Sequence, residues 1–187
     1  MRVISGKAKG RQFAVPASAR PTTDRVREAV FSIVASWAGR TDADPQLAGL
    51  AFLDLFAGSG AVALEAASRG AEAWAVESDP GAVAVLHKNA AKLGLAVHVQ
   101  RQKVESFLTR PRAQLFDVAW LDPPYALPAA ALESALASLE PWVAPGGLVI
   151  VERSGRSPDF SYPVAFTPYD RRDYGETAVY FANKGLQ

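Results

Sequence analysis

The chain has 187 residues, 49% of them apolar and 21% charged, with a formal net charge of +1, which fits one globular domain. It contains no cysteine, which excludes disulfide scaffolds, thiolate zinc sites, iron–sulfur clusters and cysteine nucleophiles. With only His87 and His98 present, a histidine-rich metal site is not expected either, and we predict chemistry without a metal.

Basic residues are concentrated in the first 27 positions, while the rest of the chain is acidic on balance. Clustered Lys and Arg gain affinity for nucleic acids by displacing counterions from phosphates, so this segment predicts a nucleic-acid contact. A solvated arm without a partner fits the charge alone equally well. The basic residues are Arg2, Lys7, Lys9, Arg11, Arg20, Arg25 and Arg27.

The N-terminus carries no recognisable targeting signal. Charged residues interrupt its short apolar stretch, and no apolar run approaches the roughly 20 residues that span a bilayer. We therefore expect a cytoplasmic protein with no membrane partner.

The first predicted element is a small β-hairpin. Residues 2–5 and 11–15 are short runs on either side of a glycine-containing segment, a pattern typical of such a turn. We expect a basic hairpin extension over residues 1–20 and the main domain over residues 21–187.

A helix is predicted next. Thr22 and Thr23 are good capping residues, and apolar residues follow them at helical spacing as far as Trp37. Residues 39–45, rich in turn formers, are the best candidate for a linker.

Beyond residue 50, short apolar strands alternate with helical segments. This alternation predicts βαβ units and a mostly parallel sheet covered by helices on both faces. The expected strands are 51–56, 73–77, 96–100, 116–122 and 148–152, and the expected helices are 60–68, 80–93, 104–110 and 128–140. Two further strands are expected at 163–169 and 177–182, and we predict that they form a closing hairpin. Arg153 and Arg156 are expected in a mobile loop that ends near Tyr162.

A glycine-rich loop follows the first of these strands. Asp54 and Phe56 lead into Gly58, Ser59 and Gly60, and a helix begins directly after them. Glycines let a ligand approach the backbone, and a helix N-terminus offers unpaired N–H donors. The loop predicts a nucleotide-like ligand, although its spacing alone also fits a dinucleotide fold or a tight turn without a ligand.

Two acids narrow the choice of ligand. Glu77 ends the second strand, where doubly wound folds place a carboxylate that accepts hydrogen bonds from ribose hydroxyls. Asp54 would repel a pyrophosphate, but it suits a ligand with a positively charged amino group and a sulfonium. We therefore predict S-adenosylmethionine rather than NAD. Asp79 is expected to cap the next helix.

A second motif follows the fourth strand. Asp122, Pro123, Pro124 and Tyr125 stand at the carboxyl edge of the sheet, where such folds bind ligands. The Asp122 side chain and the Pro123 carbonyl offer acceptors for both N–H groups of an exocyclic base amine, which would turn its lone pair toward a methyl donor. Tyr125 offers a face on which a flipped base can stack. A proline-rich turn without function is the alternative.

The combined motifs resemble a known enzyme family. Asp-Pro-Pro-Tyr with Asp-x-Phe-x-Gly-x-Gly resembles the amino-methyltransferases, and residues 2–11, 20–28 and 174–177 resemble the RsmD family of bacterial 16S ribosomal RNA guanine-N2 methyltransferases. The resemblance covers nearly the whole chain. It implies an α/β, Rossmann-like methyltransferase fold with a mostly parallel seven-stranded sheet. It also implies methyl transfer to the N2 of one guanine, position 966 in the family, in the assembling small subunit.

The resemblance assigns residues to three roles. The implied cofactor residues are Asp54, Phe56, Gly58, Ser59, Gly60, Glu77 and Val104. The implied residues at the target amine are Asp122, Pro123, Pro124 and Tyr125. The implied RNA-binding residues are Arg2, Lys7, Lys9, Arg11, Arg20, Thr22 and Arg25.

One position departs from the family. Many relatives carry Asp or Asn followed by Ala after the third strand, where the side chain contacts the adenine of the cofactor, but this chain has Lys103 and Val104. Lysine cannot accept a hydrogen bond, so a backbone contact is the alternative at this position.

Two other functions are compatible with the motifs. An adenine-N6 DNA methyltransferase uses the same chemistry, but it usually carries a target-recognition region for which 187 residues leave little room. An RNA-binding assembly factor that keeps the pocket without turnover is the second. We expect a monomer, because no long apolar stripe is left over.

Overall fold

The computed structural model of the chain describes residues 1–16, 22–40 and 46–186. No helix in these ranges is long and apolar enough to cross a membrane. The elements in chain order are α1 (Asp24–Trp37), β1 (Ala51–Leu55), α2 (Ala61–Ser68), β2 (Glu72–Glu77), α3 (Pro80–Leu93), β3 (Val97–Arg101), α4 (Val104–Leu108), β4 (Phe116–Leu121), α5 (Ala129–Leu139), η1 (Glu140–Trp142), β5 (Val143–Ser154), β6 (Phe166–Tyr174) and β7 (Thr177–Lys184).

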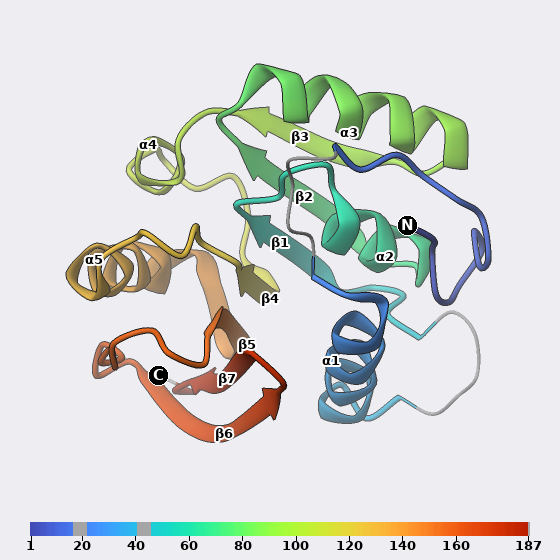
Figure 1. Cartoon of the computed structure of the whole chain (residues 1–187). Coiled ribbons are helices and arrows are strands. Elements are labelled where there is room, and N and C mark those ends of the chain that lie inside the picture. The colour runs from blue at the N-terminus through green and yellow to red at the C-terminus, as the bar shows by residue number, and fades with distance from the viewer. Residues whose placement is uncertain (17–21, 41–45, 187) are drawn as a thin grey trace.

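A seven-stranded sheet runs through the centre of the molecule (Figure 1). Its strands lie in the order β3-β2-β1-β4-β5-β7-β6. The strands from β3 to β5 in this order are parallel, and β7 runs antiparallel to both β5 and β6. The predicted mostly parallel sheet is therefore confirmed. The order reverses between β1 and β4, and sheets of this kind bind ligands beyond the carboxyl ends of the strands at that point.

Helices cover both faces of the sheet, as predicted. α1, α2 and α3 pack on one face together with the N-terminal segment, and α4 and α5 pack on the other (Figure 1). Side chains that alternate along a strand point to opposite faces, so β4 contributes Val118 and Trp120 to the first core and Ala119 and Leu121 to the second. Rigid layers on both faces fix the position of the carboxyl edge that carries the two motifs.

The last hairpin is longer than predicted. β6 continues to Tyr174, so Arg171 and Arg172 lie inside the strand and the turn falls at Gly175 and Glu176. The end of this strand was placed too early because residues 170–173 are all charged. An edge strand of charged residues shows no apolar alternation from which its length could be predicted. Pairing with β7 decides the structure instead.

The predicted N-terminal hairpin is present only in outline. The two arms of residues 1–16 run antiparallel, but they pair through a single bridge, between Arg2 and Gln12. Val3 and Phe13 are buried in the core that also contains α1 and α2. Packing on the body of the protein therefore replaces much of the ladder that a free hairpin would need.

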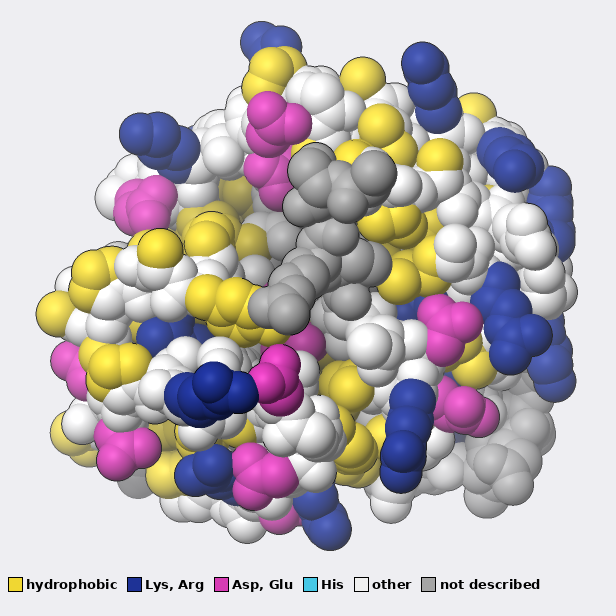
Figure 2. Space-filling view, viewed as in Figure 1, with side chains coloured by type: hydrophobic (Ala, Val, Ile, Leu, Met, Phe, Trp, Pro, Cys, Tyr) yellow, Lys and Arg dark blue, Asp and Glu magenta, His cyan; other side chains and the backbone are white. Residues whose placement is uncertain are grey.

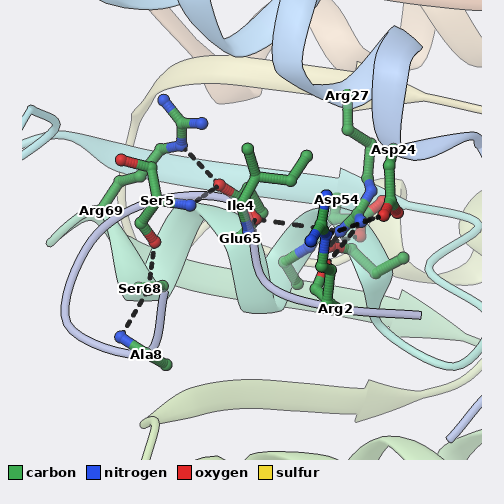
Figure 3. Close-up of polar contacts among 12 residues, drawn as sticks. Arg2, Ile4, Ser5, Ala8, Asp24, Arg27, Asp54, Glu65, Ser68 and Arg69 are labelled. Atoms are coloured by element: carbon green, nitrogen blue, oxygen red, sulfur yellow. Dashed lines mark hydrogen bonds and ion pairs between the residues drawn. The ribbon is translucent and has the colours of Figure 1, made fainter. Parts of the chain in front are cut away.

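Glu65 of α2 anchors the N-terminal segment. Its buried carboxylate accepts hydrogen bonds from the backbone N–H groups of Ile4 and Ser5, at 2.8 and 3.0 Å. Arg69 donates its Nε to the same carboxylate at 2.8 Å, and the Nη1 of Arg27 lies 3.9 Å away (Figure 3). Because Arg27 is fully buried, this part of the basic N-terminal cluster serves the fold rather than a surface.

We predict that the two glycines of the N-terminal turn respond differently to alanine. Gly6 and Gly10 both have positive φ, +77° and +80°, but a Cβ on Gly6 would lie 1.9 Å from the Ser68 carbonyl oxygen, whereas one on Gly10 would meet nothing within 4 Å. Gly10→Ala should cost about 1 kcal/mol of unfolding free energy from backbone strain. Gly6→Ala should cost about 3 kcal/mol or more, because backbone must also move. Urea denaturation measures both, and equal losses would contradict the packing described.

Candidate functional site

A cavity of about 930 Å³ opens at the carboxyl edge of the sheet, beside the point where the strand order reverses. Its walls come from the glycine loop after β1, the end of β2, the start of α4, the segment after β4 and the turn between β6 and β7. Two motifs that are distant in sequence therefore share one site. Apart from Gly60, which caps α2 below the loop, every residue predicted for the cofactor or for the target amine lines this cavity.

The backbone of the glycine loop is left-handed at Phe56, Gly58 and Gly60, with φ of 67°, 54° and 88°. Among the described residues, Phe56 is the one non-glycine with positive φ, a conformation that costs about 1–3 kcal/mol and is held where a site needs it. A Cβ on Gly58 would meet nothing within 4 Å, whereas one on Gly60 would lie 2.7 Å from Leu86 Cγ of α3. Gly58 thus leaves open space beside the backbone, and Gly60 allows α2 and α3 to approach.

Asp54 lies at the floor of the cavity and is 2% exposed. Its Oδ2 accepts a hydrogen bond from the Ala63 N–H, 3.0 Å away in the first turn of α2. Burial raises the pKa of Asp54 well above its ordinary value, and the charges of Asp122 and Glu77 raise it further, against the hydrogen bond from Ala63. Ionisation of this buried carboxyl group is costly, and a cation beside it would offset that cost. The position of Asp54 therefore favours a ligand with a positively charged group.

Glu77 ties the loop to the end of β2. Its two oxygens accept hydrogen bonds from the backbone N–H groups of Gly58 and Asp79, both at 2.8 Å. Asp79 in turn caps α3 by accepting from Ala82 N–H, as predicted. The Glu77 carboxylate faces the cavity with acceptor capacity left for a ligand hydroxyl.

Asp122 stands directly after β4, and Thr22 and Glu152 lie beside it. The Thr22 hydroxyl is 2.9 Å from Glu152 Oε2 and 3.4 Å from Asp122 Oδ2. Burial raises the pKa of Asp122 to about 7, although the hydrogen bond from Thr22 lowers it. Burial, followed by the charge of Asp122, raises the pKa of Glu152 to about 8.

The rest of the second motif forms a short turn at the mouth of the cavity. Pro123 is buried, and Tyr125 is 49% exposed. Leu127 N–H donates to the Pro124 carbonyl at 2.8 Å, and Arg153 Nη1 donates to the Leu127 carbonyl at 3.1 Å. Arg153 is 1% exposed, so its predicted place in a mobile loop is wrong. It lies in β5, where its buried guanidinium supports the turn.

The start of α4 forms part of the wall, at the position where this chain departs from the family that it resembles. Lys103 precedes α4 without a capping hydrogen bond from its side chain, and Val104 is buried. Gln102, Lys103, Val104 and Glu105 all line the cavity. This segment is therefore within reach of a ligand in the cavity.

The residues predicted to bind RNA divide into different environments. Arg2, Lys7, Lys9 and Arg25 are exposed, whereas Thr22 is 6% exposed and faces the cavity carboxylates. Arg20 lies outside the described residues. Figure 2 shows Lys and Arg gathered along the right-hand side of the molecule, where the N-terminal segment and the end of α3 lie in Figure 1.

Arg11 has a structural contact within this basic surface. Its guanidinium donates to the backbone carbonyls of Leu93, at 2.6 Å, and Lys92, at the C-terminal end of α3. A cation at this end of a helix is favourable, because the last carbonyls lack partners within the helix. Part of the basic character of the N-terminal segment therefore holds the segment in place.

Several residues that line the cavity were given no site role from the sequence, among them Glu152, Tyr174, Glu176 and Thr177. Glu152 carried a usable signal, because it follows an apolar run in a predicted parallel strand and so reaches the same carboxyl edge as Asp54 and Asp122. The other three depended on the end of β6, which was placed too early. No group of three acidic or histidine side chains in the described ranges is arranged to hold a metal ion.

We predict that the ligand-free protein loses stability as the pH rises. Asp54, Asp122 and Glu152 all have raised pKa values, so the folded state holds protons that the unfolded state has already released. The unfolding free energy should fall, by a few kcal/mol, between about pH 5 and about pH 8. Denaturation at both pH values measures this. Glu105→Gln, at an exposed position, should leave the slope unchanged, and stability that rises with pH would contradict the prediction.

Comparison with known proteins identifies relatives along almost the whole chain. A family profile described as conserved hypothetical protein 95 matches residues 1–183. The chain belongs to this family. The ribosomal RNA small subunit methyltransferase D of Escherichia coli K12 is 37% identical over 158 residues, which covers 81% of this chain and 74% of that protein. The enzyme of the same name from Haemophilus influenzae is 33% identical over 165 residues, 84% and 81% of the two chains.

A solved structure with a similar sequence has the same architecture. A hypothetical protein of Thermus thermophilus is 41% identical, covers 97% of this chain and 98% of its own, and superimposes with a TM-score of 0.81. Membership in the family confirms the resemblance inferred from the motifs. It also means that the cavity described above lies in a chain whose named relatives are ribosomal RNA methyltransferases.

Proposed function

We propose that the chain transfers a methyl group from S-adenosylmethionine to the exocyclic N2 of a guanine in 16S ribosomal RNA, as a monomer acting on the assembling small subunit. The observation that carries this proposal is the shared cavity, in which the glycine loop and the Asp122–Tyr125 segment face one another across neighbouring strands β1 and β4. The names of the two bacterial relatives support the substrate class.

The residues present fit S-adenosylmethionine. Open space beside Gly58 admits an adenosyl group, and the half-buried Glu77 offers oxygens to the ribose hydroxyls. Buried Asp54 is placed for the charged amino group, since a cation compensates the cost of ionising a desolvated carboxyl. Backbone at Lys103 and Val104 replaces the acidic or amide side chain for the adenine ring.

Asp122 and Pro123 orient the guanine amine for attack on the methyl group. The exocyclic amine of guanine is weakly nucleophilic because its lone pair is delocalised into the ring. Asp122 and the Pro123 carbonyl accept its two N–H groups, which turns the lone pair toward the glycine loop. Tyr125, at the mouth, stacks on the base that leaves the RNA.

The chain contributes positioning and desolvation rather than a covalent intermediate. When bound, S-adenosylmethionine supplies an electrophilic methyl group on a cationic sulfur. Asp122 holds the amine in line with that methyl group, and the proton that the nitrogen loses goes to Asp122 or to water. The exposed Lys7, Lys9 and Arg25 bind RNA phosphates outside the cavity.

Transfer of labelled methyl to small-subunit particles tests the proposal. The particles come from a strain without the corresponding methyltransferase, and the labelled RNA is digested to nucleosides. N2-methylguanosine is the expected product, and particles from the parent strain serve as the already modified control. A parallel reaction with DNA as substrate tests the alternative enzyme, which label in N6-methyladenine would support. Cofactor binding without transfer to either substrate would support an assembly factor.

A further inference from the structure

The Thr22 hydroxyl lies between two carboxylates that come from different strands. It is 2.9 Å from Glu152 Oε2 and 3.4 Å from Asp122 Oδ2. Thr22 is 6% exposed and Glu152 is 5% exposed, so bulk water does not readily replace the contact between them, whereas Asp122 is only partly buried and lines the cavity. Thr22 precedes α1, which means that the first helix of the main body closes on the carboxyl edge of β4 and β5 at this point.

A single hydroxyl satisfies both carboxylates only if they share a proton. Its one hydrogen goes to one carboxylate, and its oxygen accepts a hydrogen bond only from a carboxyl group that is protonated. Two ionised carboxylates in this position would repel one another in a desolvated site. The geometry therefore selects a state with one proton on the pair Asp122 and Glu152.

The difference in burial places that proton on Glu152. Glu152 is 5% exposed, whereas Asp122 is only partly buried, so an ionised carboxylate costs more at Glu152. Burial, followed by the charge of Asp122, raises the pKa of Glu152. The residue that pairs with Glu152 on β7 is Val179, which is apolar and buried. The other titratable residues of the cavity are Glu77, Lys103, Glu105, Tyr125, Tyr174 and Glu176.

We propose that Thr22 and Glu152 are positioning residues for Asp122. Protonated Glu152 donates to the Thr22 oxygen, and Thr22 donates to Asp122 Oδ2. Asp122 is thereby held as an oriented anion whose second oxygen accepts the target amine. This role rests on the proposed function, because it assigns to Asp122 the task of holding that amine.

Two substitutions of Thr22 test the hydroxyl. Thr22→Val keeps the shape and removes the donor, so the single-turnover rate of methyl transfer should fall roughly 10- to 100-fold, while cofactor affinity measured by calorimetry changes less. Thr22→Ser keeps the hydroxyl and should recover most of that loss. Equal rates for the valine and serine variants would overturn the proposal.

Two substitutions of Glu152 test whether its carboxyl group is protonated, through the pH dependence of the methyl-transfer rate. Glu152→Gln donates to Thr22 at every pH, and at about pH 7 its rate should exceed that of Glu152→Leu by about tenfold. In the natural protein the rate should fall as the pH rises through the pKa of Glu152, because ionised Glu152 takes the Thr22 hydrogen from Asp122. In Glu152→Gln this fall should move by about one pH unit or more, or disappear. The substrate titrates identically in both experiments, so superimposable profiles would overturn the proposal.

Infrared difference spectroscopy separates this inference from the proposed function, since it needs no substrate. Natural protein minus Glu152→Gln should show the C=O stretch of a protonated carboxyl group at about pH 7 and lose it at about pH 9. An active methyltransferase without this band would overturn the positioning role alone. A protein with the band that transfers no methyl to ribosomal particles would overturn the proposed function instead.

Discussion

Replacing Asp122 with alanine is expected to lower the rate of methyl transfer roughly 100- to 1000-fold, while the affinity for S-adenosylmethionine changes by less than about threefold. The loss is large because the side chain acts on the reacting nitrogen, whereas the glycine loop, Asp54 and Glu77 form a separate wall of the cavity. Single-turnover transfer and calorimetric titration of the cofactor measure the two effects independently.

Two further variants sharpen the test of Asp122. Asp122→Asn retains one oxygen acceptor and should lose less activity than the alanine variant. Asp117→Asn changes the same side chain near the opposite end of β4, where Asp117 Oδ2 accepts from Ala51 N–H at 2.8 Å, and should leave turnover unaffected. If Asp122→Ala lost cofactor binding and turnover equally, Asp122 would belong to the cofactor site instead.

Glu65→Ala is expected to lower the free energy of unfolding by about 3–5 kcal/mol. The carboxylate is fully buried and satisfies Ile4 N–H, Ser5 N–H and Arg69 Nε, with Arg27 close by (Figure 3). Removal of one partner from a buried ionic network leaves uncompensated charge, and two arginines would remain here with too few acceptors. Urea denaturation gives the size of the loss.

The matched control for Glu65 is Glu28→Ala, an exposed change on α1 that should alter stability by less than about 0.5 kcal/mol. Glu65→Gln keeps an oxygen acceptor for the N-terminal segment but loses the charge that faces the arginines. Its loss of stability should therefore be smaller than that of Glu65→Ala and larger than that of Glu28→Ala. Hydrogen exchange should also show faster exchange of residues 1–16 in Glu65→Ala. A stability loss no greater than that of Glu28→Ala would show that the network contributes little.

The alternation of strands and helices could be predicted because the central strands β1 and β4 are buried on both faces, so each reads as a short apolar run. The glycine loop and the Asp122–Tyr125 motif could be assigned to one edge, since the carboxyl ends of parallel strands meet there. Local chemistry was sufficient for Asp79, whose capping role depends only on its neighbours in sequence.

Contacts between distant segments could not be predicted. Thr22 and Glu152 meet only because α1 packs on one face of the sheet, with Thr22 just before its first turn, and no local pattern carries that information. Counting charges likewise treated Arg27 and Arg11 as surface residues, although one is buried beside Glu65 and the other binds the end of α3. Charge composition indicates a tendency, whereas burial decides the role of each side chain.

A crystal structure of the protein with S-adenosylhomocysteine and guanosine tests the central claim most directly. We predict the ribose hydroxyls at Glu77, the amino group of the cofactor product at Asp54, and the guanine amine within hydrogen-bond distance of both Asp122 and the Pro123 carbonyl. The sulfur should face the amine across the cavity. A guanine bound outside this cavity, or with its amine turned away from Asp122, would contradict the account.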